Sequence, residues 1–161
     1  DENIMAKANE EAKIVVAELL TATIKTVDPE FTVNVVFSKE YIEFLIGRDG
    51  EFDQLVASTV RRCKRAVRDD NSALVLILPY STAEYLNNEQ SFQEYYDEIE
   101  ICAESAKKHF KAAHQIRNRS MVDRSDLVVF CVEHNSGGAY QTMQYAKKVN
   151  ANIINLSDVT H

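Results

Sequence analysis

All four glycines of the chain lie at two predicted strand-to-helix junctions, beside polar side chains that suit an anion. The first junction contains Gly47 and Gly50, and the second contains Gly137 and Gly138. Glycine permits a positive φ and a close approach of backbone to a ligand. The first backbone N–H groups of a helix are unpaired and lie at the positive end of its dipole, which favours phosphate. We therefore expect the ligand site at these junctions.

Two carboxylates, Glu51 and Asp53, follow the first junction. One interpretation is structural, because acidic residues stabilise the positive end of a helix dipole. The other is catalytic or ligand-binding: either carboxylate could bind ribose hydroxyls or act as a base in glycosidic cleavage. The sequence leaves both interpretations open.

Two arginines, Arg117 and Arg119, precede the second junction. Side chains two residues apart on a helix cannot face the same way. We expect one arginine to face the site and the other to pair with Asp123 or Asp126.

The hydrophobic pattern predicts helices alternating with strands around these junctions. The expected strands are 31–37, 41–46, 73–78, a central strand beginning near Asp126, and 151–156; the expected helices are 2–27, 51–68, 92–99, 115–123 and 138–149, the last capped by Asn150. Residues 101–114 receive no assignment. This alternation predicts an α/β sandwich with a mainly parallel sheet and both glycine turns at the carboxyl edge of its strands.

Length and composition predict one domain spanning residues 1–161. No apolar run approaches the roughly 20 residues of a membrane helix, and no signal peptide is recognised. Three cysteines without a CxxC pattern favour a cytoplasmic protein. The helix expected over residues 2–27 has enough apolar positions to serve a homo-oligomer as well as a core.

The net charge of −7 argues against binding nucleic acid over the whole surface. The basic residues from Arg61 to Arg68 are interpreted as a solvated helix face, with a docking patch for an acidic partner as the alternative. No P-loop, GxGxxG or GxSxG motif is present. No cofactor is expected.

Cys102, His109 and His114 match no tight zinc-binding spacing, so no metal is expected and the histidines are interpreted as surface residues. Cys131, within the expected central strand, is predicted to lie in the core. Four tyrosines could stack a base or pack as a lid: Tyr80, Tyr85, Tyr95 and Tyr96.

Three segments in this order resemble the SLOG superfamily, the Rossmann-like group that includes the DprA/Smf proteins and the Lonely-Guy phosphoribohydrolases. They are Phe44–Asp53 (FLIGRDGEFD), Ile116–Asp126 (IRNRSMVDRSD), and Ser136–Gly138 followed by Thr142 and Tyr145–Lys147. The similarity covers residues 41–156 and is closest to the small YpsA-like bacterial branch.

The resemblance implies a Rossmann-like three-layer sandwich with a nucleotide pocket at the carboxyl edge of its sheet. The first turn, with Gly47, Arg48 and Gly50, would meet one part of the ligand. Phosphate would be held by the second turn and by arginine, which binds such groups bidentately. The residues implied for this role are Ser136, Gly137, Gly138, Thr142, Arg117 and Arg119.

Two departures from the family pattern bear on function. The YpsA-like branch usually opens with a strand carrying a Gly-His-Arg-like turn, whereas this chain opens with a helical pattern. The Lonely-Guy hydrolases follow their Gly-Gly turn with Thr and a catalytic Glu, but no carboxylate occurs between Tyr140 and Gln144. This difference argues against the hydrolase reaction.

The leading hypothesis is binding of a nucleotide or nucleotide-derived small molecule, as a sensor would do. One alternative is an enzyme that hydrolyses or transfers an N-glycosidic bond, with Asp53 or Glu51 as its carboxylate. A second is a nucleic-acid-binding domain using the basic residues from Arg61 to Arg68. A third is a protein-interaction module without a ligand. Whether the chain is an enzyme stays open.

Overall fold

The computed structural model describes residues 41–67 and 72–159 of the chain. The helix expected over 2–27 and the strand expected over 31–37 lie outside these residues. The elements are β1 (Ile42–Ile46), α2 (Glu51–Val67), β2 (Ser72–Leu78), α3 (Ala83–Asn87), α4 (Glu89–Tyr95), β3 (Glu98–Ile101), α5 (Phe110–Arg124), β4 (Val128–Phe130), α6 (Gly137–Lys148), β5 (Ile153–Asn155) and the 3-10 turn η1 (Leu156–Val159).

The protein has an α/β fold, and every strand pair among the described residues is parallel. The larger sheet has the order β1-β2-β3, with Ile46 opposite Leu76 and Leu78 opposite Ile101. All seven residues of β2 are buried. A strand covered on both faces is expected to read as a continuous apolar run, as β2 does.

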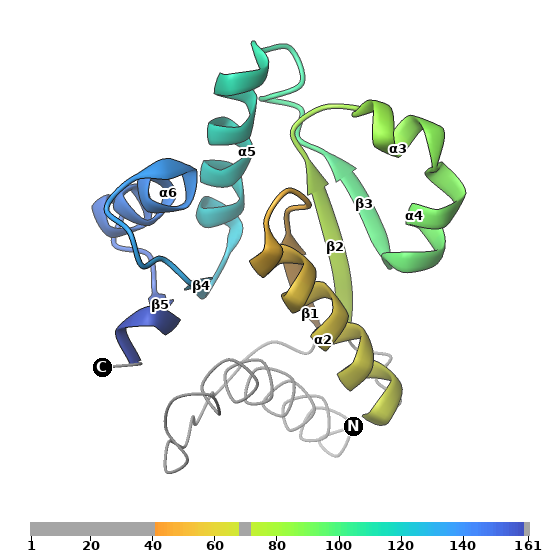
Figure 1. Cartoon of the computed structure of the whole chain (residues 1–161), viewed down its shortest axis with the longest axis horizontal. Coiled ribbons are helices and arrows are strands. Elements are labelled where there is room, and N and C mark those ends of the chain that lie inside the picture. The colour runs from red at the N-terminus through yellow and green to blue at the C-terminus, as the bar shows by residue number, and fades with distance from the viewer. Residues whose placement is uncertain (1–40, 68–71, 160–161) are drawn as a thin grey trace.

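Helices cover both faces of this sheet, which gives three layers (Figure 1). On one face, Leu74, Leu76 and Leu78 pack against buried residues of α2 and α4. On the other, Ala73, Val75 and Ile77 pack with Cys102 and with Met121 of α5. The predicted α/β sandwich is confirmed.

The sheet is divided, contrary to the single sheet expected. β4 pairs with β5 in a separate two-stranded sheet, so the strand after Asp126 is not the central one; β2 is central in the larger sheet. The two-stranded ladder itself ends at a side-chain contact beyond β4. The Asn155 side chain accepts a hydrogen bond from Val132 N at 2.9 Å and donates one to Val132 O at 3.1 Å. Beyond the last backbone pair, Phe130–Asn155, the amide side chain of Asn155 thus replaces the backbone pairing of the β4–β5 ladder.

Cys131 is exposed, and its predicted place in the core is therefore wrong. β4 ends at Phe130, one residue before it, and the chain turns out of the sheet.

The helix predicted over 92–99 is also wrong in its bounds. The helices are α3 and α4, and residues 98–101 form β3. The Glu-Ile-Glu-Ile sequence of β3 alternates with the period of a strand. α4 ends at Tyr95, and Asp97 joins the next segment to β2 and α2: its carboxylate accepts hydrogen bonds from Leu74 N at 2.7 Å and from Lys64 Nζ at 2.6 Å.

The remaining predicted elements agree with the structure to within a few residues: 41–46, 51–68, 73–78, 138–149 and 151–156 correspond to β1, α2, β2, α6 and β5. Asn150 has a φ of 56° directly after the α6 C-terminus, the conformation expected of a helix-ending Asn. α5 is longer than expected, since it begins at Phe110 inside the unassigned segment.

Replacing Leu76 with Ala should lower the free energy of unfolding by about 2–5 kcal/mol, because its fully buried side chain packs beneath α2 and α4. Leu86→Ala is the control: that side chain is 60% exposed, and its loss should change stability by less than about 0.5 kcal/mol. Urea unfolding of both variants measures the difference. Equal losses would contradict the assignment of β2 to the core.

Candidate functional site

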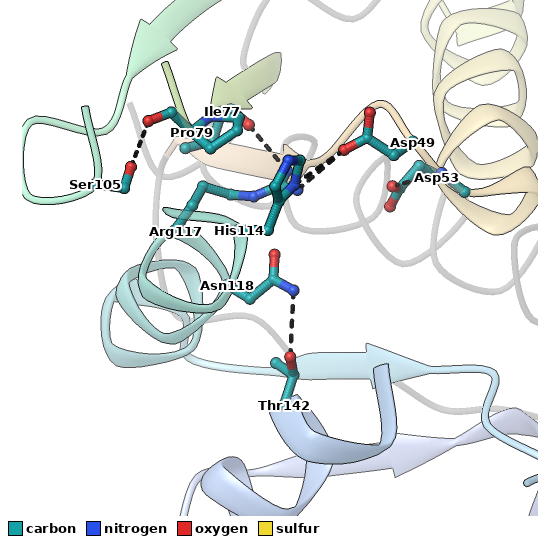
Figure 2. A network of polar contacts seen from close by, with 10 residues as sticks. Asp49, Asp53, Ile77, Pro79, Ser105, His114, Arg117, Asn118 and Thr142 are labelled. Atoms are coloured by element: carbon teal, nitrogen blue, oxygen red, sulfur yellow. Dashed lines mark hydrogen bonds and ion pairs between the residues drawn. The ribbon is translucent and has the colours of Figure 1, made fainter. Parts of the chain in front are cut away.

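Helix α5 lies between the larger sheet and the unit formed by β4, β5 and α6 (Figure 1). From this position its side chains reach the first glycine turn and, through Thr142 of α6, the second. Toward the first turn, Arg117 Nη2 lies 3.6 Å from Asp49 Oδ2. Toward the second, Asn118 Nδ2 donates a hydrogen bond of 3.2 Å to Thr142 Oγ1 (Figure 2). One helix therefore joins the two junctions that the sequence predicts as ligand-binding.

The spacing of residues on α5 explains this arrangement. His114, Arg117 and Asn118 stand at positions i, i+3 and i+4, so they share one side of the helix. The far end of α5 is fixed to β3, because Arg124 Nη1 lies 2.6 Å from Glu100 Oε2. That contact lowers the pKa of the Glu100 carboxyl through the hydrogen bond from arginine.

Arg117 is the most buried charged side chain of the site, with 4% of its surface exposed. Its Nη1 donates a hydrogen bond of 3.0 Å to the Ile77 carbonyl at the end of β2. Its Nε is buried and has no hydrogen-bond partner among the described residues. Burial lowers the pKa of Arg117, while the charges of Asp53 and Asp49 raise it. A guanidinium stays protonated under such conditions, so the site holds a fixed positive charge with spare donor capacity.

Asp53 caps the helix that begins at the first glycine turn. Its Oδ2 accepts a hydrogen bond of 3.3 Å from Gly50 N, the reciprocal bond that an acidic residue in the first turn forms in a capping box. Burial raises the pKa of this carboxyl, and Arg117 and the N–H of Gly50 oppose that shift. These contacts agree with the interpretation of Asp53 as a residue that stabilises the start of α2. The same surroundings also raise the pKa of its carboxyl.

Gly47 is required where Arg117 and Asp53 meet. A Cβ on this residue would lie 2.5 Å from Arg117 Nη1 and 2.7 Å from Asp53 Oδ2, closer than real Cβ atoms come to other atoms. Arg117 cannot easily withdraw, because it is buried and bonded to Ile77. The absent side chain is what allows the two charged groups to approach.

The second junction leaves its backbone N–H groups open. Ser136, Gly137 and Gly138 are exposed, and the Ser136 side chain makes no capping hydrogen bond. Gly137 has a φ of 90°, which other residues rarely adopt. The first turn of α6 contains no acidic residue. The positive end of α6 therefore has no counter-charge in its own first turn.

Thr142 lies beneath this junction rather than on its surface. Its hydroxyl donates a hydrogen bond of 2.8 Å to Gly138 O and accepts the bond from Asn118. Thr142 therefore holds α6 against α5 and leaves the N–H groups of the turn as the exposed donors.

Two predicted binding residues point to other partners. Arg48 Nη2 lies 2.6 Å from Glu84 Oε1, and its guanidinium lies 4.8 Å from the centre of the Phe92 ring. The hydrogen bond with Glu84 raises the pKa of Arg48. Arg119 lies over the Tyr145 ring at 5.1 Å, and the Tyr145 hydroxyl donates to Asp123 at 2.9 Å.

Glu51 is exposed at the start of α2. The structure thus brings together Gly47, Gly50, Asp53 and Arg117 at the first turn, and Ser136, Gly137, Gly138 and Thr142 at the second.

The sequence-based prediction leaves out Asp49, His114 and Asn118. His114, expected to be a surface residue, is half-buried: its Nδ1 lies 3.3 Å from Asp49 Oδ2, and the Tyr80 ring meets it edge-on at 5.9 Å. The i, i+3, i+4 spacing of His114, Arg117 and Asn118 could have indicated a shared helix face. That inference requires His114 to lie in the helix, and the sequence analysis left residues 101–114 unassigned.

The remaining predicted tyrosines belong to the α2–α4 side of the sheet. Tyr85 and Tyr96 pack on Phe92, and Tyr95 packs on Tyr96. Next to them lies an open hollow of about 470 Å³, lined by Arg48, Gln54, Leu55, Ala57, Ser58, Tyr95 and Tyr96. Two of these three tyrosines pack directly on Phe92, and the Arg61 guanidinium lies over the Tyr95 ring at 3.9 Å.

Comparison with protein-family models, with curated proteins and with solved structures finds no significant match to this chain. Among the described residues, none of the helices is long and apolar enough to cross a membrane.

Gly47→Ala should destabilise the protein by about 1–3 kcal/mol, the usual cost of overpacking, because the new methyl group meets Arg117 and Asp53. Gly50→Ala is the matched control on the same turn: its Cβ would be 3.5 Å from Asp53 Oδ2, an ordinary contact, so about 1 kcal/mol or less is expected. Urea unfolding compares the two. A larger loss for Gly50→Ala would show that the Gly47 contact is not tight.

Asp53→Asn should change how stability depends on pH. Because folding raises the pKa of Asp53, its protonated form is favoured in the folded state. The protonated carboxyl therefore contributes to the free energy of unfolding below the ordinary pKa of 3.8. This contribution is lost as the pH rises through the raised pKa of the folded state. The wild type should lose stability relative to Asp53→Asn over that rise, measured by urea unfolding in steps from pH 3.5 to neutral. A constant difference between the two proteins would contradict the raised pKa.

Proposed function

We propose that this protein binds a nucleotide or nucleotide-derived small molecule at the carboxyl edge of its strands, along α5 between the two glycine turns. The observation that carries the proposal is the link of one helix, α5, to both turns. Arg117 reaches Asp49 of the first turn, and Asn118 bonds Thr142, whose hydroxyl donates to Gly138 O of the second. Ligands of open α/β sheets bind outside the carboxyl ends of the strands, which is where the first turn follows β1.

The charges of this region favour an anionic ligand. Arg117 supplies a buried positive charge at the first turn, and the open N–H groups of Ser136–Gly138 supply partial positive charge at the second. The phosphate group is assigned to the α6 N-terminus and the rest of the ligand to the side of Arg117. The resemblance to the SLOG superfamily supports a nucleotide as the source of the phosphate.

N-glycosidic bond cleavage is the second candidate function, and Asp53 is the observation in its favour. Its carboxyl is largely buried beside Arg117 and has a raised pKa, as in sites that use a carboxyl for proton transfer. Release of free base from nucleotides by the wild type, abolished in Asp53→Asn, would support this reaction.

The nucleic-acid alternative receives less support from the basic side of α2. Arg61 donates a hydrogen bond of 3.0 Å to Tyr95 O, and Lys64 donates to Asp97. These two residues of the basic run stabilise the contact between α2 and the segment before β3.

A thermal-shift screen of the full chain against mononucleotides, cyclic nucleotides, NAD and ADP-ribose tests the proposal. A ligand present at about a hundred times its Kd adds roughly 2.7 kcal/mol to the stability of the folded state. For a domain of this size we expect a rise in Tm of several degrees.

Gly138→Val should abolish this rise, since its side chain would cover the N–H groups at the start of α6. Ala139→Val is the matched control: it places the same β-branched side chain on the next exposed residue of the helix. Equal ligand responses of the two variants would contradict binding at the second turn. Absence of any response in the wild type would favour the protein-interaction module instead.

A further inference from the structure

Three charged or titratable groups converge at the first glycine turn. Asp49 Oδ2 lies 3.3 Å from His114 Nδ1 and 3.6 Å from Arg117 Nη2, so one carboxylate oxygen contacts both side chains (Figure 2). The carboxylate comes from the turn after β1, and the imidazole of His114 and the guanidinium of Arg117 come from α5. These contacts are separate from the α6 N-terminus and have no part in the cap formed by Asp53.

The two sides of this contact differ in how firmly the protein holds them. The Arg117 side chain is 5% exposed and is bonded to the Ile77 carbonyl, whereas the Asp49 side chain is 62% exposed. Water can therefore solvate Asp49 if it leaves, but it cannot solvate Arg117 in the same way. Asp49 also stands between Gly47 and Gly50, on a turn outside helix and strand.

Arg117 has more donor capacity than its contacts use. One Nη donates to Ile77, the other lies at the long distance of 3.6 Å from Asp49, and the buried Nε has no partner among the described residues. A charge-assisted hydrogen bond to a guanidinium normally measures about 2.7–2.9 Å. Asp49 is thus a counter-ion at ion-pair distance and not a close bidentate partner.

We propose that His114 and Arg117 form a subsite for a phosphate-type dianion, and that Asp49 is its built-in counter-ion, which the dianion displaces. The inference rests on the proposed ligand site and adds a second anion-binding position to it, at the first turn. A singly charged group gains little by replacing a carboxylate that is already there. A dianion gains more attraction to the fixed charge of Arg117, with the imidazole of His114 beside it as a hydrogen-bonding group, so the subsite selects by charge.

Other groups bear on this subsite. Asp53 faces Arg117 from α2, and its negative charge opposes an incoming anion. The Tyr80 ring packs edge-on against His114 and holds the imidazole toward the turn. Asp49 is the group that can leave without unfolding a helix end, because Asp53 is the one that caps α2.

The test titrates the full chain, with 13C-labelled histidine, against inorganic phosphate and separately against acetate, at constant pH and ionic strength. NMR signals of His114 report the first turn, and amide signals of Gly137 and Gly138 report the second. Asp49→Asn should tighten phosphate binding by about fivefold, the modest factor expected for an exposed charge. It should also allow acetate to shift the His114 signals, which acetate should not do in the wild type.

His114→Gln should weaken phosphate binding at the first turn by about fivefold, followed by the amide signals of residues 47–50. Glu98→Gln is the control for net charge, because it removes one exposed carboxylate at the amino end of β3. Glu98→Gln should leave the phosphate affinity at the first turn and at the second turn within twofold of the wild type.

Failure of the inference can be told apart from failure of the proposed function. If phosphate shifts the α6 amides but leaves His114 unchanged in the wild type and in Asp49→Asn, the subsite is wrong while the proposed function survives. Weaker phosphate binding in Asp49→Asn would also overturn it, since Asp49 would then support the anion. If phosphate shifts neither set of signals in either protein, both proposals are wrong.

Discussion

The structure depends on keeping the positive charge of Arg117 inside the protein. A buried charge is tolerated only when other groups compensate it. Here the compensation comes from the Ile77 carbonyl at the end of β2, from Asp49 of the β1–α2 connection and from Asp53 in the first turn of α2. The guanidinium thereby links α5 to the ends of β1 and β2. Any change that moves it must disturb the helix, the sheet and the turn together.

This constraint explains the residues around it. Gly47 has no side chain because Arg117 and Asp53 occupy the space that a Cβ would need. Asp53 can compensate the guanidinium because the cap on Gly50 N holds its carboxylate in place. The Gly-Arg-Asp-Gly turn is therefore shaped by the arginine that arrives from α5. A glycine that looks like a ligand-binding residue in the sequence also has this packing role.

The fold could be predicted where the burial of a single helix or strand leaves its own hydrophobic pattern in the sequence. The apolar run of β2 and the amphipathic pattern of α2 are such cases. Burial on both faces leaves a continuous apolar run, and burial on one face leaves a periodic pattern. Strand pairing has no such trace. Nothing near Phe130 in the sequence indicates that Asn155 will bond Val132 and end the β4–β5 ladder, because those residues meet only in the folded chain. Cys131 was misplaced because it lies one residue beyond the end of β4, a boundary that the apolar run of the sequence does not mark.

The sequence predicted that the glycines of the first turn and Arg117 belong to one candidate site, and the structure places them together. The sequence did not predict which carboxylate lies in which surroundings. Asp49 and Asp53 stand four residues apart and face the same arginine, so the sequence does not tell them apart. The structure distinguishes them by burial. Asp53 is mostly buried and accepts a hydrogen bond from the start of α2, whereas Asp49 is mostly exposed. A carboxylate that holds a helix end cannot leave without cost to the fold. An exposed carboxylate can leave, because water solvates it. Asp49 is therefore the member of the pair suited to exchange with a ligand, and Asp53 is not.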